Sequence, residues 1–221
     1  MKKLLIVIAV LVVLYGGAAL LMRDMDILPD QSLYPLKLSG EWLDVNFLTF
    51  EAPAKQVKHL ELSERRLDEF LILSAGNRGV KYASRLNRAY ERELASAEFL
   101  AEQLVLLNPK YIPGVAMVYA MTLEQSRRLW NAAGDQSAIE RFAVSAQIYN
   151  SRAIKTLLQK HWNSDADRKL YQSMVGEKIA AVKAALQYPT AEQQTQIARA
   201  EQVLSEGKEL EWAYDIISSV R

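Results

Sequence analysis

Apolar residues recur at every third or fourth position along most of this chain. Such spacing is typical of amphipathic α-helices that bury one stripe of side chains. The clearest stripe lies between Val80 and Leu107 and contains Ala83, Leu86, Tyr90, Leu94, Ala97, Ala101 and Leu104. There is no Asn-Gly or Asp-Gly hairpin and no sustained alternation of β-branched residues. The pattern therefore predicts an all-α protein.

Turn-forming residues divide this periodicity into about six or seven helices after residue 34. The expected ranges are 35–50, 53–75, 80–107, 113–133, 136–162, 166–187 and 190–220. Asn108-Pro109 should end one helix, because proline disfavours helical geometry in the residue before it. Thr190 and Gln193 indicate a capping box at the start of the last helix. Long helices joined by short loops favour antiparallel neighbours. We therefore expect an antiparallel helical bundle, with an α-solenoid as the alternative, although no motif recurs at a fixed period.

The N-terminus carries a continuous apolar run from Leu4 to Met22 without a charged residue. A helix of this length rises about 28 Å, close to the roughly 30 Å thickness of the bilayer hydrocarbon. Lys2 and Lys3 precede the run and favour a cytoplasmic N-terminus. The run therefore predicts an uncleaved signal anchor in the bacterial cytoplasmic membrane, in contact with lipid through residues 4–22. The rest of the chain would be exported.

Two other interpretations of this run stay open. It could be a signal peptide cleaved near Gly17-Ala18-Ala19, which would release a secreted or periplasmic domain. It could also be a buried core helix, which would need other elements to cover it. The predicted organisation is an anchor at residues 1–25, an extended linker at 26–34 and an exported helical domain at 35–221.

Composition excludes several kinds of chemistry. The chain has no Cys, only two His and a formal net charge of +1. Without Cys there is no disulfide, no thiolate nucleophile and no Cys-ligated metal. The balanced charge gives no electrostatic footprint for nucleic acid. We expect no cofactor and no metal site; His59 has no second ligand at helical spacing, and His161 stands alone beside Trp162.

No catalytic motif is found. There is no Gly-x-Ser-x-Gly elbow and no phosphate-binding glycine loop. The carboxylates are expected on solvated helical faces beside Lys and Arg. The tryptophans are expected mainly in the core. Trp42 and Phe47, however, fall on the helix nearest the predicted anchor and could rest at the bilayer interface, where Trp is favoured.

The segment after the apolar run has a recognisable pattern. It contains Pro29, Asp30, Leu33, Tyr34, Pro35, Leu36 and Lys37, and Pro35 suits the first turn of a helix. A second pattern follows on the helix 53–75, with Leu60, Leu62, Arg66, Leu67 and Glu69. Together they resemble a family of bacterial membrane-anchored proteins known only as a domain of unknown function. The resemblance extends from Pro29 to Glu102 and implies an envelope location and a helical fold, without an activity. The chain departs from the family pattern at Leu38-Ser39-Gly40.

The sequence thus predicts a non-enzymatic module of the bacterial envelope, acting in interaction, scaffolding or sensing. Its partner would be another envelope protein, since only Met1 to Lys3 would lie on the cytoplasmic side. A homo-oligomer is compatible with the helical spacing but is not required by it. The alternative is an envelope enzyme, such as a helical peptidoglycan-cleaving domain with one Glu as general acid.

Overall fold

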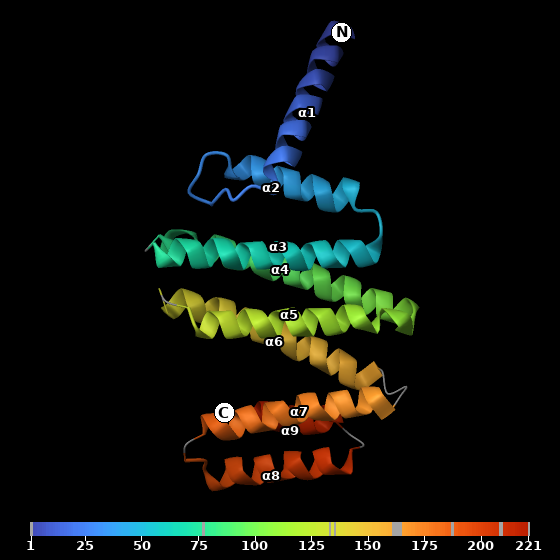
Figure 1. The fold of residues 1–221 in the computed structure, drawn as a ribbon, viewed down its shortest axis with the longest axis vertical. Coiled ribbons are helices and arrows are strands. Elements are labelled where there is room, and N and C mark those ends of the chain that lie inside the picture. Colours follow the sequence, from blue (N-terminus) through green and yellow to red (C-terminus); the bar gives the residue numbers. More distant parts are fainter. Residues whose placement is uncertain are drawn as a thin grey trace. The chain divides into compact units, whose positions relative to one another are not determined.

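The computed structural model describes residues 2–76, 78–132, 134, 136–160, 165–186, 188–207 and 210–220. Within these ranges, the side chains of residues 2–9, 11, 12, 159, 160, 165–167 and 185 are outside the description. The described part contains nine α-helices and no strand (Figure 1). The helices are α1 (Lys2–Met22), α2 (Tyr34–Leu43), α3 (Ala52–Ala75), α4 (Gly79–Leu107), α5 (Ile112–Trp130), α6 (Gln136–Lys160), α7 (Asp165–Ala185), α8 (Ala191–Glu206) and α9 (Leu210–Ser219). The prediction of an all-α helical bundle is confirmed.

The chain forms two compact units, residues 1–153 and 154–221, whose boundary falls within α6. In the first unit, α3 packs against α4, which slopes away from α3 toward α5 (Figure 1). The predicted stripe of α4 is buried throughout, from Ala83 to Leu104. Phe142 of α6 stacks on Phe70 at 4.3 Å and lies 5.3 Å from the Tyr90 ring. Aromatic residues from three helices therefore form the centre of this core.

The second unit consists of the end of α6 with α7, α8 and α9, and the last three helices contact one another. Its core contains Tyr171, Val175, Ile179, Ala200, Val203, Leu210, Ala213 and Ile217. Thr190 and Gln193 form the predicted capping box, which is confirmed. The prediction of one helix over 190–220 is wrong. Gly207 has φ of +65°, a left-handed conformation that ends α8, and α9 begins at Leu210.

The other end of the chain begins with α1, which projects from α2 on the side opposite α3 (Figure 1). Among the residues described, none of the helices has both the length and the apolar composition required to cross a membrane. The predicted span Leu4–Met22 falls on α1, and its residues 4–9, 11 and 12 lie outside the described side chains. The membrane anchor thus stays a prediction.

A strap over residues 23–33 joins α1 to α2; it has turns at both ends and an irregular stretch at residues 26–28 between them. Pro35 lies in the first turn of α2 as predicted. Gly40 of α2 packs against the backbone of Ala19, so a Cβ at position 40 would lie 2.0 Å from the Ala19 carbonyl oxygen. The two helices can cross this closely only because residue 40 has no side chain. The predicted helix 35–50 changes at Asp44–Leu48 into a π-helical turn (η1).

Candidate functional site

Four charged side chains are buried between α2 and α3. Lys37 and Glu41 come from α2, whereas Arg66 and Glu69 come from α3. Arg66 is only 2% exposed. Buried charges occur almost only when they are paired, because transfer from water is costly. We call these four side chains together with Tyr34 the Tyr34 network. Each of its charged groups is therefore expected to have a partner of opposite charge.

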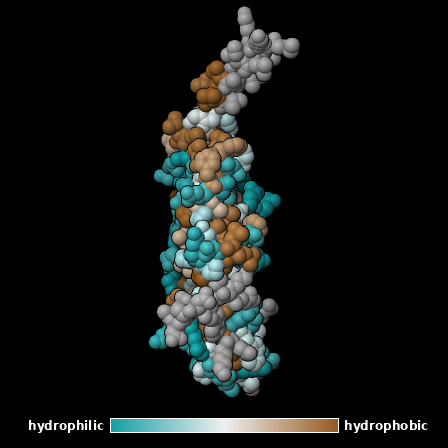
Figure 2. All heavy atoms as spheres, turned by 90° about the vertical axis from the view of Figure 1, so that its right-hand side faces the viewer, coloured by the Kyte–Doolittle hydropathy of each residue, from teal (hydrophilic) through white to brown (hydrophobic). Residues whose placement is uncertain are grey.

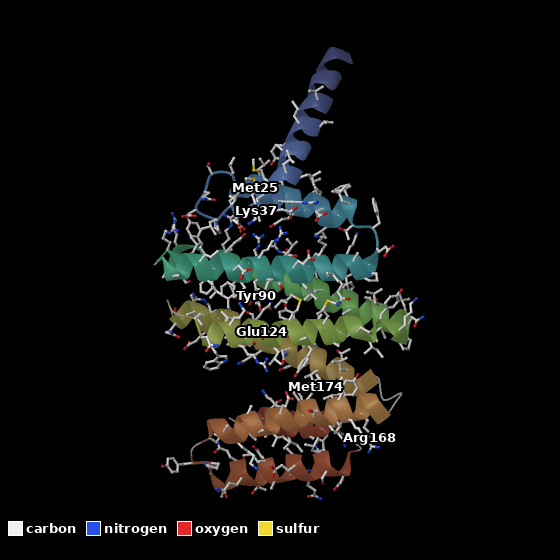
Figure 3. All side chains as sticks on the ribbon, viewed as in Figure 1. Met25, Lys37, Tyr90, Glu124, Arg168 and Met174 are labelled. Carbon is white, nitrogen blue, oxygen red and sulfur yellow. The ribbon has the colours of Figure 1, made fainter. Side chains whose placement is uncertain are left out.

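Each member of the Tyr34 network has a partner in it. The Lys37 ammonium contacts Glu69 Oε1 at 2.8 Å and donates to the carbonyl of Ile27 in the strap at 3.1 Å. The Tyr34 hydroxyl donates to Glu69 Oε2 at 2.7 Å and accepts from Arg66. Arg66 Nη2 also contacts both oxygens of Glu41, at 2.5 and 2.6 Å. Figure 3 shows Lys37 between α2 and α3.

The charges of the Tyr34 network balance, with two cations and two anions. Burial raises the pKa of the Tyr34 phenol, although the charge of Arg66 opposes the shift. Burial also raises the pKa of the Glu41 carboxyl, against the opposing charge of Arg66. Burial alone would lower the pKa of the Arg66 guanidinium, but Glu41 and Glu69 raise it on balance. Because the charges and hydrogen bonds are internally satisfied, the network fastens α2 and the strap to α3.

A cleft of about 450 Å³ opens beside this network, lined by residues of α2, η1, α3 and α4. We call it the Trp42 cleft, after the α2 residue that forms one wall and is 58% exposed. The complete lining is Leu38, Glu41, Trp42, Val45, Asn46, His59, Leu62, Arg66, Arg85, Ala89, Arg92 and Glu93. Its volume is within the range of ordinary ligand sites, roughly 300–1,000 Å³.

Both carboxylates in the Trp42 cleft are held in pairs. Glu41 is engaged by Arg66, as described above. Glu93 Oε2 lies 2.7 Å from Nδ1 of His59. By contrast, Arg85 and Arg92 are exposed and make no ion pair with any residue in the described part of the chain. Arg85 does lie over the Tyr34 ring, 5.5 Å from its centroid. The cleft therefore offers an aromatic wall and two guanidinium groups without an ion-pair partner among the described residues, while its acidic groups are paired.

The two family patterns meet in the structure. Tyr34 and Lys37 of the first pattern contact Arg66 and Glu69 of the second, in the Tyr34 network. The remaining pattern residues are placed separately. Pro29, Leu60, Leu62 and Leu67 are buried; Leu33 and Pro35 are exposed, and Leu36 is half-buried; Asp30 is paired with Arg78. Most pattern residues thus serve the junction of the strap, α2 and α3.

Sequence reasoning missed Glu41, Arg85 and Arg92. Glu41 had a signal, because positions 34, 37 and 41 share one helical face and all are polar or amphipathic where a core-facing stripe would be apolar. The expectation that carboxylates lie on solvated faces is wrong for Glu41 and Glu69, which are buried. Buried polar side chains of this kind persist only where a facing helix supplies partners.

The expectation that tryptophans lie mainly in the core is wrong for Trp130 and Trp212, whereas Trp42 had been set apart as a possible interface residue. Trp42, Trp130 and Trp212 are all exposed, Trp130 by 76%. Trp162 and His161 lie outside the described residues. Within the described ranges, no group of three or more potential metal ligands occurs.

Comparisons with known proteins gave no match among protein-family models, curated proteins or solved structures. The resemblance carried by residues 29–102 therefore stays a prediction.

Proposed function

We propose that this protein is a membrane-anchored helical module of the bacterial envelope that binds a partner through the Trp42 cleft. The observation that carries the proposal is which side chains of the cleft are paired and which are not. Trp42 is exposed, and Arg85 and Arg92 have no acidic partner in the described part of the chain, whereas Glu41 and Glu93 are both paired. Exposed aromatic and arginine side chains are the groups that most often anchor a binding partner.

The anchor in this proposal is α1. Its apolar run from Leu4 to Met22 is long enough to span a bilayer. Exposed apolar side chains follow closely in sequence at Phe47, Leu48 and Phe50, and Figure 2 shows hydrophobic residues gathered at the level of α2. Aromatic residues at this position suit the headgroup region of a membrane. The Tyr34 network would then hold the domain in a fixed orientation at the membrane surface.

The competing function is a peptidoglycan-cleaving enzyme that uses a cleft carboxylate as its general acid. The geometry favours binding over this alternative. A general acid must present a proton to the substrate within hydrogen-bond reach. Both oxygens of Glu41 contact Arg66, and one oxygen of Glu93 contacts His59. Glu41 therefore has both oxygens engaged, and Glu93 has one of its two oxygens engaged, which leaves little of either carboxylate to act as the acid.

The absence of Cys makes the anchor directly testable. The exposed strap residue Ser32 is changed to Cys, and intact cells are treated with a membrane-impermeant maleimide. We expect labelling in intact cells, and we expect the chain to stay in the membrane fraction after alkaline carbonate extraction. Labelling only after lysis, or release by carbonate, would contradict the proposed anchor and orientation.

Partner binding is tested by replacing Trp42 with a photoreactive benzoylphenylalanine in the native cells. The matched control carries the same group at Trp130, which is also exposed but lies outside the Trp42 cleft. We expect the crosslinker at position 42 to capture one discrete envelope protein. The crosslinker at position 130 should not capture that protein. Crosslinking from position 42 to glycan strands alone would favour the enzymatic alternative.

A further inference from the structure

The outer face of α4 carries a row of four basic side chains. Lys81, Arg85, Arg88 and Arg92 are separated by four, three and four residues, which places them along one face of the helix. All four are exposed, and none forms an ion pair with another described residue. We call this set the α4 basic row.

This absence of ion pairs contrasts with the adjoining helix α3. There, Lys58 pairs with Glu61 at 2.9 Å, and Arg65 pairs with Asp24 of the strap at 2.9 Å. The acidic residue Glu93 of α4, which lines the same cleft as Arg85 and Arg92, is paired with His59 of α3. The α4 basic row therefore gathers four cations without an ion-pair partner among the described residues, in a chain whose formal net charge is only +1.

The α4 basic row runs into the Trp42 cleft. Arg85 and Arg92 line the cleft, and Ala89 lies between them on the same face, one turn from each. Because alanine is small, it leaves the floor open between the two guanidinium groups. The opposite walls carry the apolar side chains of Trp42, Val45 and Leu62 beside polar and charged ones. Cationic and apolar groups thus face the same space.

We propose that this surface binds an acidic polypeptide segment of a partner, with an apolar side chain seated against Trp42. The row extends about 16 Å, at 1.5 Å per residue, which is longer than a single small anion can bridge. Guanidinium groups pair well with carboxylates, and neither Arg85 nor Arg92 has an ion-pair partner among the described residues. The inference rests on the proposed binding role of the Trp42 cleft and names the chemistry of its partner.

A lipid surface fits the arrangement less well than a polypeptide. In the first unit, α2 lies between α1 and the α3–α4 pair (Figure 1). Lipid surrounding α1 would therefore be separated from the α4 basic row by the thickness of α2, about 10 Å. A protein segment can approach the row from the side without this restriction.

The test uses the full chain purified in detergent and a fluorescent peptide of glutamate and leucine, with glutamate at every third or fourth position. Counterparts carry glutamine or lysine in place of glutamate. We expect the glutamate peptide to bind the wild type. The double variant Arg85→Glu, Arg92→Glu should bind this peptide about tenfold more weakly or worse, because two charge pairs with the peptide are lost. The lysine peptide should then bind the charge-reversed variant in preference to the wild type.

The matched control is Arg127→Glu with Arg141→Glu, which makes the same change in charge at two exposed residues outside the cleft. It should leave peptide affinity within about twofold, because distant surface charges are screened. A second variant, Ala89→Tyr, fills the cleft floor without altering charge and should also weaken binding.

Equal binding of the glutamate and glutamine peptides would overturn the proposal. The proposal would also be overturned if the peptide did not bind while phosphatidylglycerol vesicles bound the protein in a manner that depends on Arg85 and Arg92. Because the peptide test is done in detergent, its result is independent of whether α1 spans a membrane. Failure of the peptide to bind is thus distinguishable from failure of the proposed anchor.

Discussion

The Tyr34 hydroxyl donates a 2.7 Å hydrogen bond to Oε2 of Glu69, and the same hydroxyl accepts from Arg66. This contact joins the first turn of α2 to the middle of α3. It means that the orientation of α2, and with it the position of Trp42, is set by a buried polar network as well as by apolar packing. The network and the Trp42 cleft share Glu41 and Arg66, so the wall of the cleft is held by the same contacts that fasten α2.

Replacement of Arg66 by Ala should be strongly destabilising. The substitution leaves the carboxylates of Glu41 and Glu69 buried without their shared cation. Removing one partner of a buried ion pair typically costs about 3–5 kcal/mol. We expect a loss of this size in the first unit, measured by urea denaturation with hydrogen exchange of the α2 and α3 amides as a local readout.

Arg127→Ala is the control for this change. Arg127 is 65% exposed and lies 3.7 Å from Glu124 on the same helix. Exposed pairs at this spacing are worth only about 0.3–0.5 kcal/mol, so its loss should be barely measurable. A similar cost for the two variants would show that the Tyr34 network does not fasten α2.

Alkaline pH should destabilise the protein partly through Tyr34. Burial raises the pKa of its phenol above the ordinary value of about 10. The native state therefore keeps the proton at a pH where the unfolded chain releases it, so this contribution to stability is present below about pH 10 and is lost as the pH rises further.

The Tyr34→Phe variant isolates this contribution. It should cost about 1–3 kcal/mol at neutral pH, because Glu69 and Arg66 lose a buried partner. Its stability should then fall less steeply than that of the wild type above about pH 10. Denaturation curves at several alkaline pH values measure both effects. If the stability of Tyr34→Phe fell as steeply with pH as that of the wild type, Tyr34 would not be a source of the alkaline destabilisation.

Sequence pattern predicted the helices well where one stripe of side chains faces one neighbour. The stripe of α4 from Ala83 to Leu104 was predicted residue by residue and is buried. The pattern was less informative for α3. That helix buries a second face against α2, and Arg66 and Glu69 lie on it. A helix with two buried faces has no single apolar stripe to read.

The candidate site could be predicted only in part, because its members come from segments far apart in sequence. The family patterns contained Tyr34, Lys37, Arg66 and Glu69, but their mutual contact is a property of the fold. The division at Gly207 was missed because the surrounding residues continue a helical pattern. Only the left-handed backbone conformation there reveals the end of α8.

Gly40→Ala should separate α1 from α2. The added Cβ would lie 2.0 Å from the carbonyl oxygen of Ala19, a backbone atom that cannot move without shifting α1. Overpacking of this kind costs about 1–3 kcal/mol. We expect faster tryptic cleavage after Arg23 in the strap. Gly17→Ala is the matched control, since a Cβ there has no atom within 4 Å. Equal cleavage of the two variants would contradict this close crossing.

Gly207→Ala should destabilise the second unit. The left-handed conformation at φ of +65° costs a residue with a Cβ about 1–2 kcal/mol. The new Cβ would also crowd Arg168, whose Nη2 donates to the Gly207 carbonyl at 2.8 Å (Arg168 is labelled in Figure 3). Gly176→Ala, within α7, should instead stabilise by up to about 1 kcal/mol. Thermal unfolding of the two variants should therefore shift in opposite directions.

Trp42→Ala should separate binding from stability. Trp42 is 58% exposed, and its main aromatic contact is the equally exposed Phe47, edge to face at 5.3 Å. An aromatic pair of this kind contributes about 0.5–1.5 kcal/mol, so the variant should stay folded. Phe70→Ala, which empties a fully buried site stacked on Phe142, should cost about 3–5 kcal/mol. If the Trp42 cleft binds the partner, Trp42→Ala abolishes partner capture by a crosslinker at Asn46, an exposed residue at the edge of the cleft, while its unfolding transition stays close to that of the wild type. Retention of capture by the Trp42→Ala protein would mean that the aromatic wall is not part of the binding surface.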